Sequence, residues 1–509
     1  MGAVWGLLKR GIHPEIWDIG ESLPPENEIL KEGIKNGSIR RNKELVQNLM
    51  PPNATGIPQK TLFGSEYFRG HNRRFAPSLG SVDLVSPSFA KGGFSVAWGG
   101  AILPIHQSDM EKWPISRNSL EAGYREVMRR IPLAYSENSE LDCQDFPLFA
   151  EPEGVLPLSA QAKWVLDRSG RGRQLAGRVQ SARLALRVDP LVQKNACVQC
   201  GLCLSGCAHD SIYNFSESLK GLPKGIRYRN GIVLTRLNAQ DGQIYAHAVD
   251  VHGAPVPTEK FDHVLLGAGA ISTTRIILES LQLFETDLTL LDSQKFILPG
   301  LTTKSFRRNR AAEISLPQLF MDFQDSNGHW NHAQLTCVND YILTALPSFM
   351  AKDKGLVPRV VGPLTSRLMT AWCGLHSDYS SKFQIRLLRA HSSGRPILKT
   401  KPYLNPNTPA HIKSAANAFF RLARSAGLWL IPLAKRIGGP GAGCHFGGSL
   451  PMSDNPQNAW ETNVLGEVHG LPGVHVVDTA TFPSIPGTTV GLTTAANAYR
   501  IASEISLSS

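Results

Sequence analysis

Four of the eight cysteines in this chain lie together in the segment CVQCGLCLSGC. Their spacing, C-x2-C-x2-C-x3-C, is typical of the thiolates that hold iron–sulfur clusters in bacterial ferredoxins. In ferredoxins the fourth cysteine usually serves a second cluster and is followed by proline. This chain has no second cysteine motif of this kind, and Ala208 follows its fourth cysteine. We therefore predict an iron–sulfur cluster (3Fe-4S or 4Fe-4S), with zinc or a purely structural loop as alternatives. The predicted ligands are Cys197, Cys200, Cys203 and Cys207.

A second segment, SPSFAKGGFSVAWGG, combines several glycines with a serine and a tryptophan. Such a density of glycines lets the backbone approach a flat ligand closely. A turn-rich surface loop would have the same composition, so this segment alone does not decide between the two. The candidate binding residues are Gly92, Gly93, Ser95, Trp98 and Gly99.

The first twenty residues predict a helix around Leu7, a stop at Gly11 and a strand that ends at Asp18. In a dinucleotide-binding unit, an acidic residue at the end of the second strand accepts the ribose hydroxyls, and Asp18 fits this role. The first strand and its G-x-G-x-x-G turn should precede such a helix, but the sequence starts at about the third glycine. We expect either that an upstream segment is missing from this sequence or that the phosphate loop is lost.

Later segments predict the elements of an α/β layer. Alternating residues in IRYRNGIVLTRLNAQDGQIYAHAVDVHG predict hairpin strands that turn at Asp241 and at His252. The segment DHVLLGAGAISTTRIILES reads as a buried strand, a turn through Gly267 and Gly269, and a helix whose N-terminus suits a phosphate or flavin edge. Near the C-terminus, GVHVVDTATFP predicts a strand that ends at Asp478, and GLTTAANAYRIASEI predicts an amphipathic helix. A further helix is expected over residues 409–426.

Length and charge narrow the class of protein. A chain of 509 residues is long enough for two structural domains. The net charge of +11 comes without long basic runs, so we expect no nucleic-acid partner and interpret the charge as solubility plus a preference for anionic substrates or membrane surfaces. No stretch approaches the ~20 apolar residues of a membrane span. We expect a cytoplasmic protein, with a peripheral membrane location as the alternative.

The motifs together resemble the glucose–methanol–choline (GMC) oxidoreductases, a family of FAD-dependent alcohol oxidases and dehydrogenases. In the family's order, the chain carries the Asp18 strand, GGFSVAWGG, WPIS, LLGAGAISTTRIILES, CHFGGSLPM, TNVLGEVHGLPGVHVVDTATFP and an alanine-rich terminal helix. Each match is weak alone. The ordered set is specific and covers nearly the whole chain.

The resemblance implies an α/β protein, α+β overall, with a discontinuous Rossmann-like FAD-binding domain and a substrate domain whose antiparallel sheet lies over the flavin. We expect the FAD-binding domain in residues 1–35, 70–105, 225–290 and 440–509, and the substrate domain in residues 106–224 and 291–439 with the cysteine-rich loop 197–207. It also implies that the glycine-rich segment lies along the flavin ring, that Val233 passes the adenine, and that Asp478 lies near the ribityl chain and phosphates.

The family also implies two catalytic positions. A base that removes the hydroxyl proton during hydride transfer should titrate near neutral pH, which suits histidine, and His445 in HFGGSLPM stands at the family's histidine position. The second family position, usually histidine or asparagine, falls on Thr489, which can donate a hydrogen bond but is a poor base. We also expect Trp330, His332, His376 and Asp378 to line a sugar pocket.

The expected function is therefore FAD-dependent oxidation of a CH–OH group of a sugar, polyol or other small alcohol. Two alternatives stay open. The chain could be an iron–sulfur-containing dehydrogenase subunit that passes electrons to a partner protein, or a non-catalytic relative that lost its flavin with the glycine loop.

Overall fold

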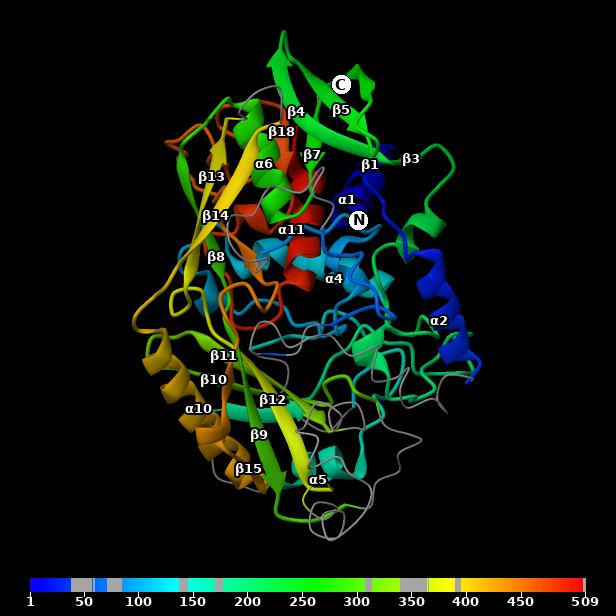
Figure 1. Ribbon diagram of the computed structural model, residues 1–509, viewed down its shortest axis with the longest axis vertical. Helices are drawn as coiled ribbons and strands as arrows, with labels where there is room; N and C mark the ends of the chain where they lie inside the picture. Colours follow the sequence, from blue (N-terminus) through cyan, green and yellow to red (C-terminus); the bar gives the residue numbers. More distant parts are fainter. Residues whose placement is uncertain are drawn as a thin grey trace.

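Two pairs of parallel strands lie near one end of the molecule, together with three helices (Figure 1). The computed structural model describes residues 1–37, 57, 60–70, 85–136, 145–169, 177–306, 314–338, 364, 366–389 and 395–506. Strand β1 pairs with β3, and β7 pairs with β18, so each pair joins segments that are far apart in the sequence. The elements of this region are α1 (Gly2–Lys9), β1 (Glu15–Asp18), β3 (Arg227–Asn230), β7 (Val264–Leu266), α6 (Ala270–Ser280), β18 (Val474–Val476) and α11 (Gly491–Glu504).

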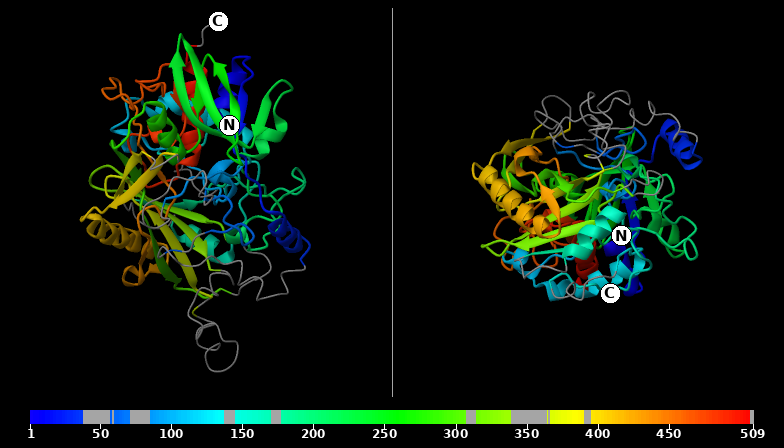
Figure 2. Two further views of the ribbon diagram at one scale, coloured as in Figure 1. Left: turned by 45° about the horizontal axis from the view of Figure 1, so that its top comes forward. Right: turned by 90° about the horizontal axis from the view of Figure 1, so that it is seen from below.

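An antiparallel sheet, β4-β5-β6, projects from the same end of the molecule (Figures 1 and 2). Its first turn contains Asp241 with a φ of 51° and Gly242 with a φ of 73°, which is the left-handed conformation that tight hairpin turns require. The predicted hairpins are confirmed. The strands are β4 (Ile232–Gln240), β5 (Gln243–Asp250) and β6 (Pro255–Phe261).

The opposite half of the molecule is built on a seven-stranded antiparallel sheet (Figure 1). The order is β15-β9-β12-β11-β10-β2, with β16 also paired to β9. Its apolar face packs against α10 and α5 in one large core that includes Phe296, Leu335 and Phe419. The bounds are β2 (Gly177–Ser181), β9 (Lys295–Thr302), β10 (Leu319–Gln324), β11 (Trp330–Cys337), β12 (Leu368–Gly374), β15 (Leu428–Leu430), β16 (Arg436–Ile437), α5 (Ala160–Ser169) and α10 (Thr408–Ser425).

A four-stranded antiparallel sheet connects the two halves through its order β14-β13-β8-β17. Strand β8 continues almost directly into β9 of the larger sheet, and β17 brings the residues after His445 against the end of β8. The bounds are β8 (Asp287–Asp292), β13 (Lys382–Leu388), β14 (Ile397–Tyr403) and β17 (Phe446–Gly447). The remaining α-helices that the structure describes are α2 (Pro25–Lys35) and α4 (Glu121–Arg130).

Helix α11 departs from its prediction because it is buried on nearly all sides rather than amphipathic. Glycines of two neighbouring helices make this possible: a Cβ on Gly6 of α1 would lie 2.6 Å from the Tyr499 carbonyl oxygen, and one on Gly123 of α4 would lie 2.3 Å from that of Ala496. The backbones of α1 and α4 therefore touch α11 directly. The pattern within α11 could not show this, because the glycines lie elsewhere in the chain.

The predicted fold class is confirmed as a mixed α/β protein with several antiparallel sheets. The expected helix over 409–426 and the strand–turn–helix at 264–280 are present within a residue or two. Part of the predicted strand segment after residue 338 lies outside the described residues. Among the described helices, none has the length and apolar character needed to cross a membrane.

Candidate active site

Asp18 stands at the end of β1, where the nucleotide-binding prediction placed it. Its carboxylate accepts hydrogen bonds from the Gly20 amide at 3.1 Å and the Tyr228 hydroxyl at 2.9 Å, and burial raises its pKa. Reciprocal backbone bonds between Glu21 and residues 89 and 91 tie this turn to the start of the glycine-rich segment. Val233 is buried against Phe89 in the same region. The structure thus brings the predicted nucleotide residues beside the predicted flavin loop.

Side-chain hydrogen bonds fix the backbone of the glycine-rich segment, and two of its glycines have free space beside them. The Ser95 hydroxyl donates to the Gly92 carbonyl at 2.6 Å, and the Trp98 indole donates to the Tyr213 carbonyl at 2.6 Å. Gly92 and Gly93 have φ values of 98° and 60°, a conformation that favours glycine. Apart from the adjoining residues, no heavy atom of the described part of the chain lies within 4 Å of the position where a Cβ would stand on Gly93 or Gly99. This fixed, glycine-lined open space fits a flat ligand such as the flavin.

Asp478 joins the end of β18 to the N-terminus of α6. Its buried carboxylate accepts bonds from the Gly269 amide at 2.9 Å, the Thr273 hydroxyl at 2.5 Å and the Ala480 amide at 2.9 Å, while burial raises its pKa. Gly267 lies against Val477 beside this junction, and the Cβ position of Gly269 faces open space. The predicted residues Gly267, Gly269 and Asp478 therefore meet at one turn, where the Asp478 oxygens hold the backbone.

His445 lies next to the junction of the two antiparallel sheets. Its carbonyl oxygen accepts from the Ser293 amide at 2.9 Å, and the residues that follow pair with the end of β8. The ring is half-buried, and its Nδ1 has no hydrogen-bond partner within the described structure. Burial, and then the positive charges of Lys295 and His332, lower its pKa well below the usual value. His445 is therefore a neutral imidazole that can accept a proton, but its pKa lies below the near-neutral range expected of the base.

Thr489 lies on the segment between β18 and α11. Its Oγ1 accepts from the Leu103 amide at 3.0 Å and is buried. The same segment runs close to the large sheet, because a Cβ on Gly487 would lie 2.9 Å from the carbonyl oxygens of Gly374 and Trp330. At its other end a Cβ on Gly491 would lie 3.0 Å from the Trp98 ring. This segment therefore connects the sheet with the glycine-rich loop.

Two charged residues near His445 were not predicted. Burial lowers the pKa of Lys295 to about 8 and raises that of Asp292 to about 7, and the charges of the two side chains oppose these shifts. The Lys295 ammonium donates to the Ser293 hydroxyl at 3.0 Å. An ionisable residue in an otherwise apolar strand was the available signal, but sequence spacing does not show which strands are neighbours.

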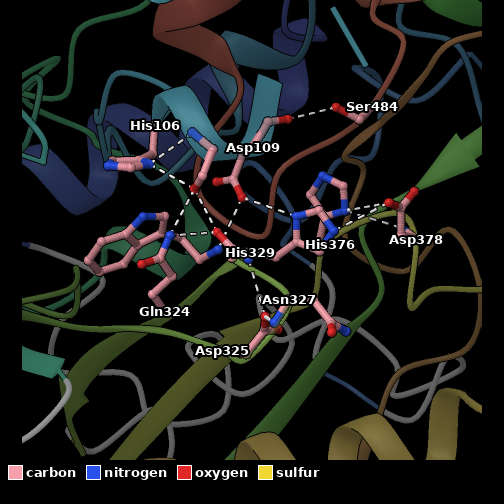
Figure 3. Close-up of polar contacts among 12 residues, drawn as sticks. His106, Asp109, Gln324, Asp325, Asn327, His329, His376, Asp378 and Ser484 are labelled. Carbon is pink, nitrogen blue, oxygen red and sulfur yellow. Dashed lines mark hydrogen bonds and ion pairs between the residues drawn. The ribbon is translucent and has the colours of Figure 1, made fainter. Parts of the chain in front are cut away.

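His376 and Asp378 belong to an ion-pair network with Asp109 and His329, apart from the partners of His332 (Figure 3). His329 lies between the two carboxylates, 3.6 Å from Asp109 and 3.3 Å from Asp378, and these partners raise its pKa to about 9. The Ser484 hydroxyl donates to the Asp109 carbonyl at 2.9 Å, which ties the network to the segment before α11. The sugar-pocket expectation for these residues stays a prediction.

Donor atoms of Asp109, His329 and His376 lie within 4.8 Å of one another, close enough for a metal. However, the rings of His329 and His376 are stacked, with centroids 3.8 Å apart and planes inclined by 11°. The lone pairs of ring nitrogens lie in the ring planes, so those of two stacked rings do not converge on one ion. As arranged, the cluster is an ion-pair network around a charged His329.

The four cysteines of the loop line one pocket, together with Leu186, Gly206 and His209. Burial, followed by the proximity of the other cysteines, raises the pKa of Cys197 to about 12. Three of the cysteines pack in the same apolar cluster as Trp98. The ammonium of Lys60 donates to the Trp98 carbonyl at 3.0 Å. Burial lowers the pKa of Lys60, and the nearby Cys203 and Cys207 oppose this shift. The loop therefore lies beside the glycine-rich segment.

Within the described residues, the group of three or more potential metal ligands with donor atoms inside 4.8 Å is the Asp109 cluster, not the cysteine loop. Zn–S bonds of about 2.3 Å in a tetrahedron require sulfurs about 4 Å apart. The loop as it stands is wider than a zinc site.

Comparisons with known proteins identify the fold of the chain and the family of its C-terminal segment. The family model described as GMC oxidoreductase matches residues 380–498. Among 132 similar chains of solved structures is pyridoxine 4-oxidase from Mesorbium loti, with a TM-score of 0.55, 11% sequence identity, and coverage of 98% of this chain and 95% of that one. No curated protein sequence matches the chain. The matched segment contains His445, Asp478 and Thr489 in the predicted order, so residues 380–498 match the C-terminal domain of GMC oxidoreductases, and the whole chain has the fold of such an oxidase.

Proposed function

We propose that this protein is an FAD-dependent oxidoreductase that oxidises a CH–OH group of a sugar, polyol or other small alcohol, with His445 as the base. The observation that carries the proposal is a neutral, half-buried imidazole with an unpartnered Nδ1 at the family's histidine position. A neutral imidazole that faces an alcohol can take the hydroxyl proton as the C–H bond breaks. The family match supports the reaction class.

The residues divide between holding the cofactor and handling the proton. Asp18 and Val233 would contact the adenosine half, and the open side of Gly93 and Gly99 would contact the ring system. The turn fixed by Asp478 leaves Gly269 free for close approach. When bound, FAD would supply the acceptor for a hydride from the carbinol carbon.

Flavin binding can be tested by substituting two glycines that have similar free space and backbone conformation. Gly99 and Gly221 both have room for a Cβ and neither has a positive φ. We expect Gly99→Ala to fold normally but to retain at least tenfold less flavin, because overpacking a fitted ligand costs about 1–3 kcal/mol. Gly221→Ala, on the surface, should retain the wild-type amount. Equal flavin in the two variants would contradict the proposed cradle.

The reaction is tested by anaerobic mixing of the purified flavoprotein with a panel of sugars and polyols. We expect at least one alcohol to bleach the visible flavin band, and His445→Asn to slow the bleaching by about 10²–10⁴-fold. If the protein carries no flavin, or if no alcohol bleaches it, the non-catalytic alternative is favoured. Activity with dyes but not with oxygen would identify a dehydrogenase that needs an acceptor.

A second candidate function is electron transfer through an iron–sulfur cluster on Cys197, Cys200, Cys203 and Cys207. It is favoured by the single pocket that these residues line and by their packing beside Trp98. Iron and sulfide analysis of protein purified without oxygen tests it. We expect three or four irons per chain, lost in Cys200→Ser. Iron-free protein, or zinc in its place, would remove this candidate.

A further inference from the structure

One row of residues crosses the large sheet from edge to centre. The strand registers pair Arg178 with Asp322, Asp322 with His332, His332 with Gly374, and Gly374 with Lys295. Directly opposed residues of antiparallel strands project to the same face. Neighbouring positions on these strands, such as Phe296, Met321 and Ala333, pack in the core with α10. The polar row therefore lies on the other face.

Within this row, His332 is held by Asp322. Its Nδ1 lies 2.7 Å from Asp322 Oδ1, and the second carboxylate oxygen accepts from the Gln180 amide at 2.8 Å. Burial alone would raise the pKa of Asp322, but His332 and Arg178 outweigh it and the pKa is lowered. Asp322 therefore stays ionised beside the imidazole, in the manner of the carboxylate that orients a catalytic histidine.

The other nitrogen of His332 has no partner. Its Nε2 is buried and forms no hydrogen bond within the described structure, while the whole side chain is 3% exposed. A buried polar atom without a partner is costly, so such an atom points to a missing ligand. With Nδ1 committed to Asp322, Nε2 is the atom that would contact that ligand.

The next residue of the row is a glycine, and the space that a side chain would occupy is filled by its neighbours. Gly374 has no side chain, and a Cβ there would lie 2.3 Å from the Gly487 carbonyl oxygen and 2.6 Å from the Lys295 ammonium. The glycine thus lets the segment before α11 approach the sheet between His332 and Lys295. Lys295 also lies against the segment of the proposed base, because a Cβ on Gly443 would lie 2.6 Å from its Cγ and the Ser293 amide donates to the His445 carbonyl at 2.9 Å.

We propose that His332 is a second catalytic residue of this site and that its Nε2–H donates a hydrogen bond to the substrate oxygen opposite His445. The inference rests on the proposed function. When bound, FAD would supply the acceptor for the hydride that leaves the carbinol carbon, while the hydroxyl proton would pass to His445 and the C–OH group would become a carbonyl. The Nε2–H donor, held in place by the contact of Nδ1 with Asp322, stabilises the negative charge that develops on the oxygen. The Thr489 hydroxyl, already bonded to Leu103, is not required for this role.

The test uses the flavin-loaded protein and the alcohol that reduces it. His332→Ala should lower kcat about 10²–10³-fold with a smaller change in KM, as expected for a donor that acts mainly in the transition state. His332→Gln keeps a neutral donor and should recover part of this loss. His411→Gln, on α10 at the far face of the sheet, is the matched control and should leave both constants unchanged.

The hydrogen bond between His332 and Asp322 can also be tested by NMR, without enzyme turnover. In the folded protein, the Nδ1 proton of His332 bonded to Asp322 should give a downfield proton NMR signal that is absent in both His332→Gln and Asp322→Asn. No such signal in the wild type would overturn the positioning by Asp322. If the wild-type protein oxidises no alcohol, the proposed function fails and this inference fails with it. If the wild type is active and His332→Ala is equally active, only this inference fails.

Discussion

The charge state of His329 is set by two carboxylates. Asp109 and then Asp378 raise its pKa to about 9, against the effect of burial. The stacked ring of His376 responds in the opposite direction, because burial and then the charge of His329 lower its pKa to about 3. One histidine of the stack is therefore charged at neutral pH and the other is not. The charged ring links Asp109, next to the segment before α11, with Asp378 after β12.

This arrangement predicts a loss of stability on the alkaline side of neutrality. A histidine whose folded pKa lies above its ordinary value of about 6.5 contributes stability that is fully present below that pH. The contribution is lost as the pH rises through about 9. We expect the urea midpoint of the wild type to fall between pH 6.5 and 9.5 more than that of His329→Gln. If the urea midpoints of the two proteins change equally with pH, the ion pairs of His329 contribute nothing to stability.

Single residues of the site were predictable where a local motif surrounds them. His445, Asp478 and the glycines near Trp98 occur in segments whose order along the chain is characteristic. Asp322 and Lys295 were not predictable, because their significance depends on the register of β10, β11, β12 and β9. A sequence shows that a strand contains a buried carboxylate. It does not show which histidine lies opposite.

At the scale of elements, helix α11 depends on backbone contact with its neighbours. In an exposed helix, replacing glycine with alanine stabilises by about 1 kcal/mol. At Gly6 the added Cβ would lie 2.6 Å from the Tyr499 carbonyl oxygen and 2.8 Å from the Ala502 Cβ. We therefore expect Gly6→Ala to destabilise the protein by about 1–3 kcal/mol in urea unfolding. Gly221→Ala, with no atom near its Cβ position, serves as the control. A stabilised Gly6→Ala variant would mean that α1 shifts freely on α11.

Element boundaries were predicted better than element partners. Helix α10 has its buried residues at spacings of three and four, from Ile412 through Phe419 to Ala423, and such periodicity is visible in the sequence. The surroundings of α11 and the order of the large sheet arise from contacts between distant segments. Local patterns cannot specify these contacts, because each pattern reports only the face that one element buries.

At the scale of the whole molecule, the proposed cofactor region is assembled from both ends of the chain. Strand β1 near the N-terminus pairs with β3 near the middle, and β18 near the C-terminus pairs with β7. Helix α11 packs between α1 and α4. Closing loops over such distances costs chain entropy before the stabilising contacts form, so this region depends on non-local contacts.

The C-terminal segment should therefore not fold alone, although it contains three of the seven family motifs. A fragment of residues 440–509 would hold β17, β18 and α11 without β8, β7, α1 or α4, which are the partners that bury them. An isolated helix of this length is marginal in water, and a strand without a neighbour has no ladder. We expect the fragment to show a far-UV circular dichroism spectrum of a mostly unfolded chain, with no cooperative thermal transition, under conditions where the full chain melts cooperatively. A cooperative transition in the fragment would place the stability of this region in local contacts, against the packing by α1 and α4 described above.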